Sequence, residues 1–193
     1  MSQLSELFLS KVRVKLIELF LANPDNIYYV REIVRAVSEQ INAVRSELNR
    51  MEQIGLLASE WRANRKYYSV RKDYIFFDEL LRLVSKTTGL GGAIIRDKVR
   101  LGKIKYAMLS GGYVRGLKPG PNDVEMLLVG VVVLPQLTLI VKDEEAKLGR
   151  EINYTVMSEE EFAFRKTRRD PFVIGLLEKP RVMIIGDELE MLG

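Results

Sequence analysis

The spacing of apolar residues changes halfway along the chain, and this change constrains the fold more than any other feature. Through residue 51, apolar side chains recur every three or four positions, the repeat of helices with one buried face. From residue 104 onward they gather in short continuous runs, which are typical of buried strands. These runs cover residues 104–109, 124–132, 152–157 and 182–185. The pattern predicts an α+β chain with a helical first part and a small mixed sheet, covered by helices, in the second.

Three helices are predicted in the first part. Their apolar positions are Leu9, Val12, Leu16, Leu19 and Phe20; then Val30, Ile33, Val34 and Val37; then Ile41, Val44, Leu48 and Met51. The first helix ends at the breaker Asn23-Pro24, and residues 38–40 make the turn between the second and the third. Gly55 suits the C-terminal cap of the third helix.

The third helix also carries a polar face followed by a basic hairpin. The polar residues fall at i, i+3, i+4 and i+7 and therefore line up: Asn42, Arg45, Ser46 and Asn49. Asn pairs well with adenine edges, Arg with guanine and Ser with either in a major groove. Two strands, 57–61 and 67–71, are predicted next, joined by a loop with Arg62, Asn64, Arg65 and Lys66. Such a hairpin suits phosphate or minor-groove contacts.

The distribution of charge agrees with a nucleic-acid contact in this region. The formal net charge is only +4, but residues 40–72 hold seven Lys and Arg against three Asp and Glu. A positive excess confined to one short segment indicates a nucleic-acid partner. The alternatives are a solvated basic face, or a helical unit used only for protein contacts.

Three helices and a basic hairpin in this order resemble the winged helix-turn-helix domain of bacterial and archaeal transcription regulators. The phrase YVREIV at 29–34 is similar to their second-helix motif, and the resemblance covers about residues 5–74. It implies salt-dependent binding to double-stranded DNA. We expect this domain over 1–74, a helical connector over 75–101 and a second domain over 102–193. Two-fold symmetric recognition of palindromes makes a homodimer the default.

A glycine turn and two acids mark the second domain. SGGYVRG at 110–116 follows the strand predicted over 104–109. Asp123 and Glu125 then occupy alternate positions of the next predicted strand, so they are expected to face the same way. Such a pair beside free backbone N–H groups could hold Mg²⁺ and a phosphate. The alternatives are a simple turn, a solvated acidic edge, or an ion pair between Arg115 and one acid.

The segments LSGGYVRG at 109–116 and NDVEMLLVG at 122–130 are similar to the nucleotidyltransferase superfamily, especially its minimal antitoxin-like members. The resemblance implies a phosphate-binding turn at Gly111 and Gly112, with Arg115 as a further nucleotide-binding candidate. It implies metal ligands at Asp123 and Glu125, and a third acidic position at Glu151 or Asn153. GREINYTVM at 149–157, with DPF at 170–172, resembles regulators that fuse a winged helix to such a domain.

Three departures from the family pattern predict that catalysis has been lost. Gly112 replaces the phosphate-binding serine, and Glu125 is one methylene longer than the usual aspartate. Mg²⁺ demands near-ideal octahedral geometry and tolerates displaced ligands poorly. If Asn153 holds the third position, its amide cannot accept a proton from the attacking hydroxyl. Asp123, Glu125 and Asn153 are therefore predicted to be vestigial catalytic residues.

Composition narrows the remaining possibilities. The chain has no cysteine and no histidine, which excludes thiolate catalysis, Ser–His triads and Cys/His zinc sites. The longest apolar run stops at Pro135, short of the roughly 20 residues that a membrane helix needs, and no export signal is visible. We therefore expect a cytoplasmic protein without a membrane partner.

Together these features predict a DNA-binding transcriptional regulator that requires no cofactor, with Mg²⁺ and a nucleotide as candidate ligands of its second domain. Its degenerate nucleotidyltransferase-like domain would serve ligand sensing or dimerisation. The alternative is a Mg²⁺-dependent nucleotidyltransferase that moves a nucleotide from ATP to an RNA or to a protein, such as a toxin partner. A scaffold whose winged helix binds protein or RNA is a third hypothesis.

Overall fold

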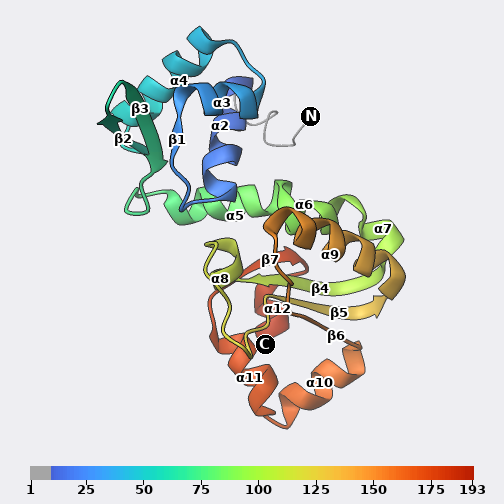
Figure 1. The fold of residues 1–193 in the computed structure, drawn as a ribbon. Coiled ribbons are helices and arrows are strands. Elements are labelled where there is room, and N and C mark those ends of the chain that lie inside the picture. The colour runs from blue at the N-terminus through green and yellow to red at the C-terminus, as the bar shows by residue number, and fades with distance from the viewer. Residues whose placement is uncertain (1–9) are drawn as a thin grey trace. The chain divides into compact units, whose positions relative to one another are not determined.

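The computed structural model describes residues 10–193, which divide after Thr87 into two compact units (Figure 1). The predicted apolar position Leu9 lies outside the described residues. Residues 75–101, expected as a connector, are divided between the units. Helix α5 (Phe77–Thr87) belongs to the first, and helices α6 (Gly89–Arg96) and α7 (Lys98–Leu101) belong to the second. Within the described part of the chain, no helix is both long and apolar enough to cross a membrane.

The first unit combines helices with a small antiparallel sheet in the order β1-β3-β2. Its elements before α5 are α2 (Lys11–Ala22), β1 (Tyr28–Tyr29), α3 (Val30–Val37), α4 (Ile41–Gln53), β2 (Leu57–Arg62) and β3 (Arg65–Val70). The apolar stripes of the sequence form the core, because Leu16, Phe20, Ile33, Val44 and Leu48 are fully buried. The helical periodicity therefore located the helices, but their buried faces only in part: Val14, Ile17 and Leu21 of α2 are also buried, and Ile41 of α4 is 38% exposed.

The hairpin of the first unit is longer than the sequence predicted. Strands β2 and β3 pair up to Arg62 and Arg65, leaving Ala63 and Asn64 as the turn. Ala63 adopts a positive φ of 52°. Three of the four residues expected in the loop, Arg62, Arg65 and Lys66, thus occupy strand positions, where neighbouring side chains point to opposite faces, and Asn64 remains in the turn.

The second unit is built on a mixed sheet in the order β6-β5-β4-β7, in which β5 and β6 are parallel and the other pairs antiparallel. The strands are β4 (Gly102–Ser110), β5 (Met126–Val132), β6 (Tyr154–Met157) and β7 (Arg181–Ile185). The remaining helices are α8 (Gly111–Val114), α9 (Leu134–Leu148), α10 (Glu159–Thr167), α11 (Pro171–Glu178) and α12 (Glu188–Leu192). Figure 1 shows α6 and α9 on one side of the sheet, with α10 and α11 on the other.

Both faces of this sheet are covered, which explains the continuous apolar runs of its central strands. Tyr106 and Met108 of β4 join a core cluster with Phe162 of α10 and Val173 of α11. The intervening Ala107, which faces the other way, is also buried. Strand β4 bulges between Ile104 and Tyr106. All four predicted strands are present, but β5 and β6 begin at Met126 and Tyr154, each two residues later than expected, and β4 begins two residues earlier, at Gly102.

Candidate nucleic-acid interface and glycine-turn cavity

The polar face of α4 is exposed to solvent. Its members, all of them exposed, are Asn42, Arg45, Ser46 and Asn49. Within residues 10–193, none of these four side chains makes a hydrogen bond or an ion pair with another residue. The helix therefore offers an aligned row of donors and acceptors that the fold itself does not use. Such a row can serve an external partner with polar edges.

A buried carboxylate on the core side of α4 links this helix to the segment at Ser10 and Arg13. Glu47 is 6% exposed and lies on the core side, between the apolar positions Val44 and Leu48. It accepts hydrogen bonds from Arg13 Nε at 2.8 Å, Arg50 Nη1 at 3.0 Å and Ser10 Oγ at 3.3 Å. Burial alone would raise the pKa of Glu47, but Arg13, Arg50 and Ser10 together hold it below its ordinary value. The sequence gives no signal for this role of Glu47, because no local pattern pairs a glutamate with an arginine 34 positions away.

The four residues predicted to line the hairpin loop do not share one surface. Arg62 and Arg65 oppose each other and point to the outer face of the sheet, away from buried Tyr68 and Val70. Lys66 alternates to the inner face, where its ammonium donates to Glu52 Oε2 of α4 at 2.8 Å. Asn64 is exposed in the turn.

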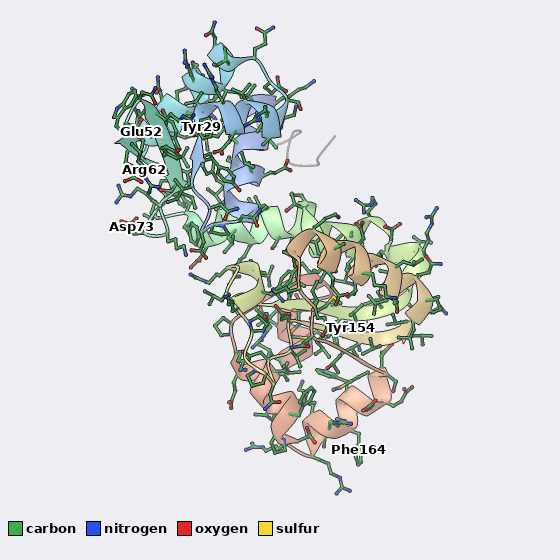
Figure 2. All side chains as sticks on the ribbon, viewed as in Figure 1. Tyr29, Glu52, Arg62, Asp73, Tyr154 and Phe164 are labelled. Carbon is green, nitrogen blue, oxygen red and sulfur yellow. The ribbon has the colours of Figure 1, made fainter. Side chains whose placement is uncertain are left out.

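The outer face of the small sheet carries an arginine–tyrosine cluster. The guanidinium of Arg65 lies 4.8 Å from the ring centre of Tyr29, and that of Arg62 lies 5.2 Å from the ring centre of Tyr67. The two tyrosine rings are 5.7 Å apart. Arg35 Nη2 of α3 donates to the hydroxyl of Tyr29 at 3.4 Å. Figure 2 labels Tyr29 and Arg62 on this unit.

The inner face of the hairpin bears an exposed tryptophan, which was not among the predicted site residues. Trp61 opposes Lys66, and 69% of its surface is exposed. Glu52, labelled in Figure 2, also accepts a hydrogen bond from the Ser59 hydroxyl. The Lys66 ammonium lowers the pKa of Glu52, and Ser59 adds to that effect. An aromatic residue beside a basic hairpin tip was a visible signal in the sequence.

The glycine turn of the second unit is held by one local hydrogen bond and by one to the segment before β7. Ser110 Oγ accepts from Tyr113 N at 3.1 Å and caps the short helix α8. Gly111 N donates to Pro180 O at 2.7 Å, and a Cβ on Gly111 would lie 2.9 Å from the Pro180 ring. A Cβ on Gly112 would meet only Ser110 Oγ, at an ordinary contact distance of 3.9 Å. A side chain at position 111 would clash with Pro180, so this position requires glycine. Packing does not require glycine at position 112.

The two acids of the motif line the same cavity but are bound to separate cations. Asp123, partly exposed, accepts from Lys179 Nζ at 2.7 Å and from Gly120 N at 2.9 Å. The Lys179 ammonium holds the pKa of Asp123 below its ordinary value, and the Gly120 amide assists. Glu125 is buried and accepts from Arg150 at 2.7 and 2.9 Å. Both residues precede β5, so the alternation expected within a strand does not apply to them.

Glu125 is a poor Mg²⁺ ligand in this arrangement. Its carboxylate accepts two bonds from Arg150 and a third from the backbone N–H of Asn153 at 3.2 Å, which occupies most of its lone-pair positions. Asn153 meets Glu125 through its backbone, and Glu151 is exposed. Among residues 10–193, no three Asp, Glu, His or Cys side chains gather closely enough to hold a metal. The residues as placed do not fit the magnesium site that the resemblance implies.

A cavity of about 230 Å³ remains beside the glycine turn. Its walls are Ser110, Gly112, Tyr113, Leu117, Lys118, Pro119, Asp123, Val124, Glu125, Lys179 and Pro180. The Tyr113 ring lies 6.0 Å from the Arg150 guanidinium, and burial raises the pKa of its hydroxyl. The volume is below the ~300–1,000 Å³ usual for drug-sized ligands. Arg115, the further nucleotide candidate, is exposed and does not line this cavity.

Comparison with known proteins does not assign the chain to a family. No protein-family model matches it, and no curated protein matches it. Among solved structures, the chain is similar to reduced HlyU from Vibrio cholerae N16961, at 20% sequence identity and a TM-score of 0.33. That similarity covers 42% of this chain and 83% of the HlyU chain.

Proposed function

We propose that the chain is a DNA-binding transcriptional regulator whose first unit is a winged helix. The observation that carries this proposal is the exposed row on α4, in which Asn42, Arg45, Ser46 and Asn49 have no partner within residues 10–193. Helix α4 follows α3 through a short turn and is itself followed by a hairpin, the order used by winged helix-turn-helix proteins. In this proposal α4 enters the major groove and reads base edges.

Arg62 and Arg65 would bind the DNA backbone beside the groove that α4 reads. They lie at the tip of the hairpin, and both side chains are exposed. Within the described residues, neither Arg45 nor Arg65 has a carboxylate partner, so their charges are available to phosphate or to guanine. Lys66 contributes less, because Glu52 already pairs with it.

The second unit would act as a regulatory domain with a small ligand in the glycine-turn cavity. Both carboxylates of the motif carry a cationic partner, Lys179 for Asp123 and Arg150 for Glu125, which favours a sensor over a transferase. Titration of ATP with and without Mg²⁺ by calorimetry tests this part. Binding without nucleotide transfer supports a sensor. Transfer of labelled nucleotide to protein or RNA, abolished by Asp123→Ala, would establish the enzyme alternative instead.

Binding to the chain's own promoter DNA tests the central proposal. The full chain is titrated into labelled duplex, and Arg45→Ala is expected to weaken binding about fivefold or more, since a bidentate base contact contributes ~1–3 kcal/mol. Arg65→Ala should weaken promoter and unrelated duplexes alike. Arg82→Ala, which removes an exposed charge from α5 of the same unit, is the matched control. If Arg45→Ala and Arg65→Ala both leave binding untouched, the proposal fails.

A further inference from the structure

We propose that Tyr29 and Tyr67 are positioning residues for DNA binding, because their rings hold the guanidinium groups of Arg65 and Arg62 in place before DNA arrives. The inference rests on the proposed function and assigns a role to two residues that need not touch DNA. It concerns the outer face of the β1-β3-β2 sheet, where the rings and the cations lie together.

Strand register brings this cluster together. Tyr29 pairs with Tyr67 across β1 and β3, and Arg65 precedes Tyr67 by two positions on the same face. Arg62 pairs with Arg65 across the turn. The two tyrosine rings therefore lie next to the two arginines on one face of the sheet. The Arg65 guanidinium is 4.8 Å from the Tyr29 ring, and the Arg62 guanidinium is 5.2 Å from the Tyr67 ring. Both distances lie within the ~6 Å range of cation–π attraction.

An uncharged aromatic ring can hold an arginine in place without cancelling the positive charge that DNA binding needs. A carboxylate would also hold an arginine, but it would cancel the positive charge. Lys66 on the inner face shows this contrast, since Glu52 both holds and neutralises it. On the outer face, Arg65 has a ring beneath it and no acid partner within residues 10–193. Arg62 is an intermediate case, because it rests on Tyr67 and also donates to Glu60 at 2.7 Å.

Tyr29 additionally joins the hairpin to α3. Its backbone N–H donates to Glu32 at 3.0 Å at the start of α3, and its hydroxyl accepts from Arg35 at 3.4 Å. The ring therefore lies between a cation of α3 and a cation of β3. A free arginine loses much side-chain entropy when it binds phosphate, and one already restrained on a ring loses less. The rings should thus increase affinity without adding a phosphate contact.

The salt dependence of DNA binding separates positioning from charge. Tyr67→Leu and Tyr29→Leu remove the rings and keep every cation, so affinity should fall about three- to tenfold while the slope of log K against log salt stays unchanged. Arg65→Gln should lower both the affinity and the slope, the latter by about one. Tyr67→Phe keeps the ring and should bind within about twofold of wild type.

A double variant provides the decisive comparison. If Tyr29 acts through Arg65, Tyr29→Leu added to Arg65→Gln should cost little more than Arg65→Gln alone. Full additivity would overturn the inference, and so would wild-type affinity in both Leu variants. If a Leu variant fails to fold by circular dichroism, Arg62→Lys replaces it. That variant keeps the charge and loses the planar group, so weaker binding at an unchanged slope is expected, and wild-type affinity would overturn the inference.

The same titration distinguishes this inference from the proposed function. If the wild-type chain does not bind duplex DNA, the proposed function itself fails. If wild type binds and Arg45→Ala weakens it, but both tyrosine-to-leucine variants match wild type, only the positioning role fails.

Discussion

Arg150 donates to both carboxylate oxygens of Glu125, at 2.7 and 2.9 Å, and the glutamate is only 2% exposed. The fold therefore buries an acid beside the glycine turn and neutralises it with a side chain 25 positions further along the chain. A bidentate pair of this kind is specific in geometry as well as in charge. The motif that resembled a metal site contains a structural ion pair at its centre.

Removal of one partner from this pair should destabilise the second unit. Arg150→Ala leaves the Glu125 carboxylate buried without its counter-charge, and we expect a loss of about 3 kcal/mol in the free energy of unfolding. Urea unfolding followed by circular dichroism measures the loss. Lys142→Ala, on the exposed side of α9, is the control and should change stability by less than about 0.5 kcal/mol. Equal stability of the two variants would show that the pair contributes nothing.

Acid should weaken the first unit through Glu47. Since contacts with Arg13, Arg50 and Ser10 hold the folded-state pKa of Glu47 below its ordinary value of 4.5, the stabilisation is present above about pH 4.5. It is lost as the pH falls through the lower folded-state pKa. Glu47→Gln should destabilise the unit by about 1–2 kcal/mol near neutral pH. The variant should also lose less stability than wild type on acidification, and parallel pH curves would contradict this assignment.

The two faces of the hairpin should respond differently to loss of charge. Lys66→Met removes a cation already paired with Glu52, so it should lower DNA affinity by less than about threefold and leave an unpaired glutamate that weakens the unit slightly. Arg65→Gln should weaken binding more, with a lower salt slope. Parallel anisotropy titrations at several salt concentrations compare the two. A larger effect of Lys66→Met would place the DNA on the inner face.

Two glycines of the second unit should respond to alanine with opposite signs. Gly130 has a φ of 139°, and a Cβ there would lie 2.3 Å from Lys103 O, so Gly130→Ala should cost roughly 2–4 kcal/mol. Gly175 in α11 has open space around it, so Gly175→Ala should stabilise by about 0.5–1 kcal/mol. Thermal unfolding of both variants measures the difference. A tolerated Gly130→Ala would mean that the bulge near Ile104 rearranges freely.

The helices and strands could be predicted because their signals are local. The apolar repeat that includes Val44, Leu48 and Met51 predicts helix α4. The polar residues on the opposite face of that helix predict that Arg45 is exposed. The turn at Gly111 was equally visible, because it follows a buried run. The apolar repeat nevertheless omitted the buried Glu47 and included Ile41, which is 38% exposed.

The ion pairs could not be predicted, because their partners are distant in sequence. Nothing near Asp123 indicates Lys179, 56 residues away, and nothing near Glu125 indicates Arg150. The hairpin posed a different difficulty. A loop predicted over residues 62–66 gives no reason to distinguish Arg65 from Lys66. In the structure the turn has only two residues, so both lie in β3 and their side chains point to opposite faces of the sheet. A shift of one or two residues in a strand boundary was enough to change which cations face solvent freely.

Trp61 gives the molecule a built-in optical reporter. It is the only tryptophan in the chain, and 69% of its surface is exposed at the tip of the hairpin. Indole emission therefore originates from one known position in the first unit, with no tryptophan signal from the second. Quenching by iodide, or a shift in emission wavelength on adding duplex, would follow events at the hairpin in the unlabelled native chain.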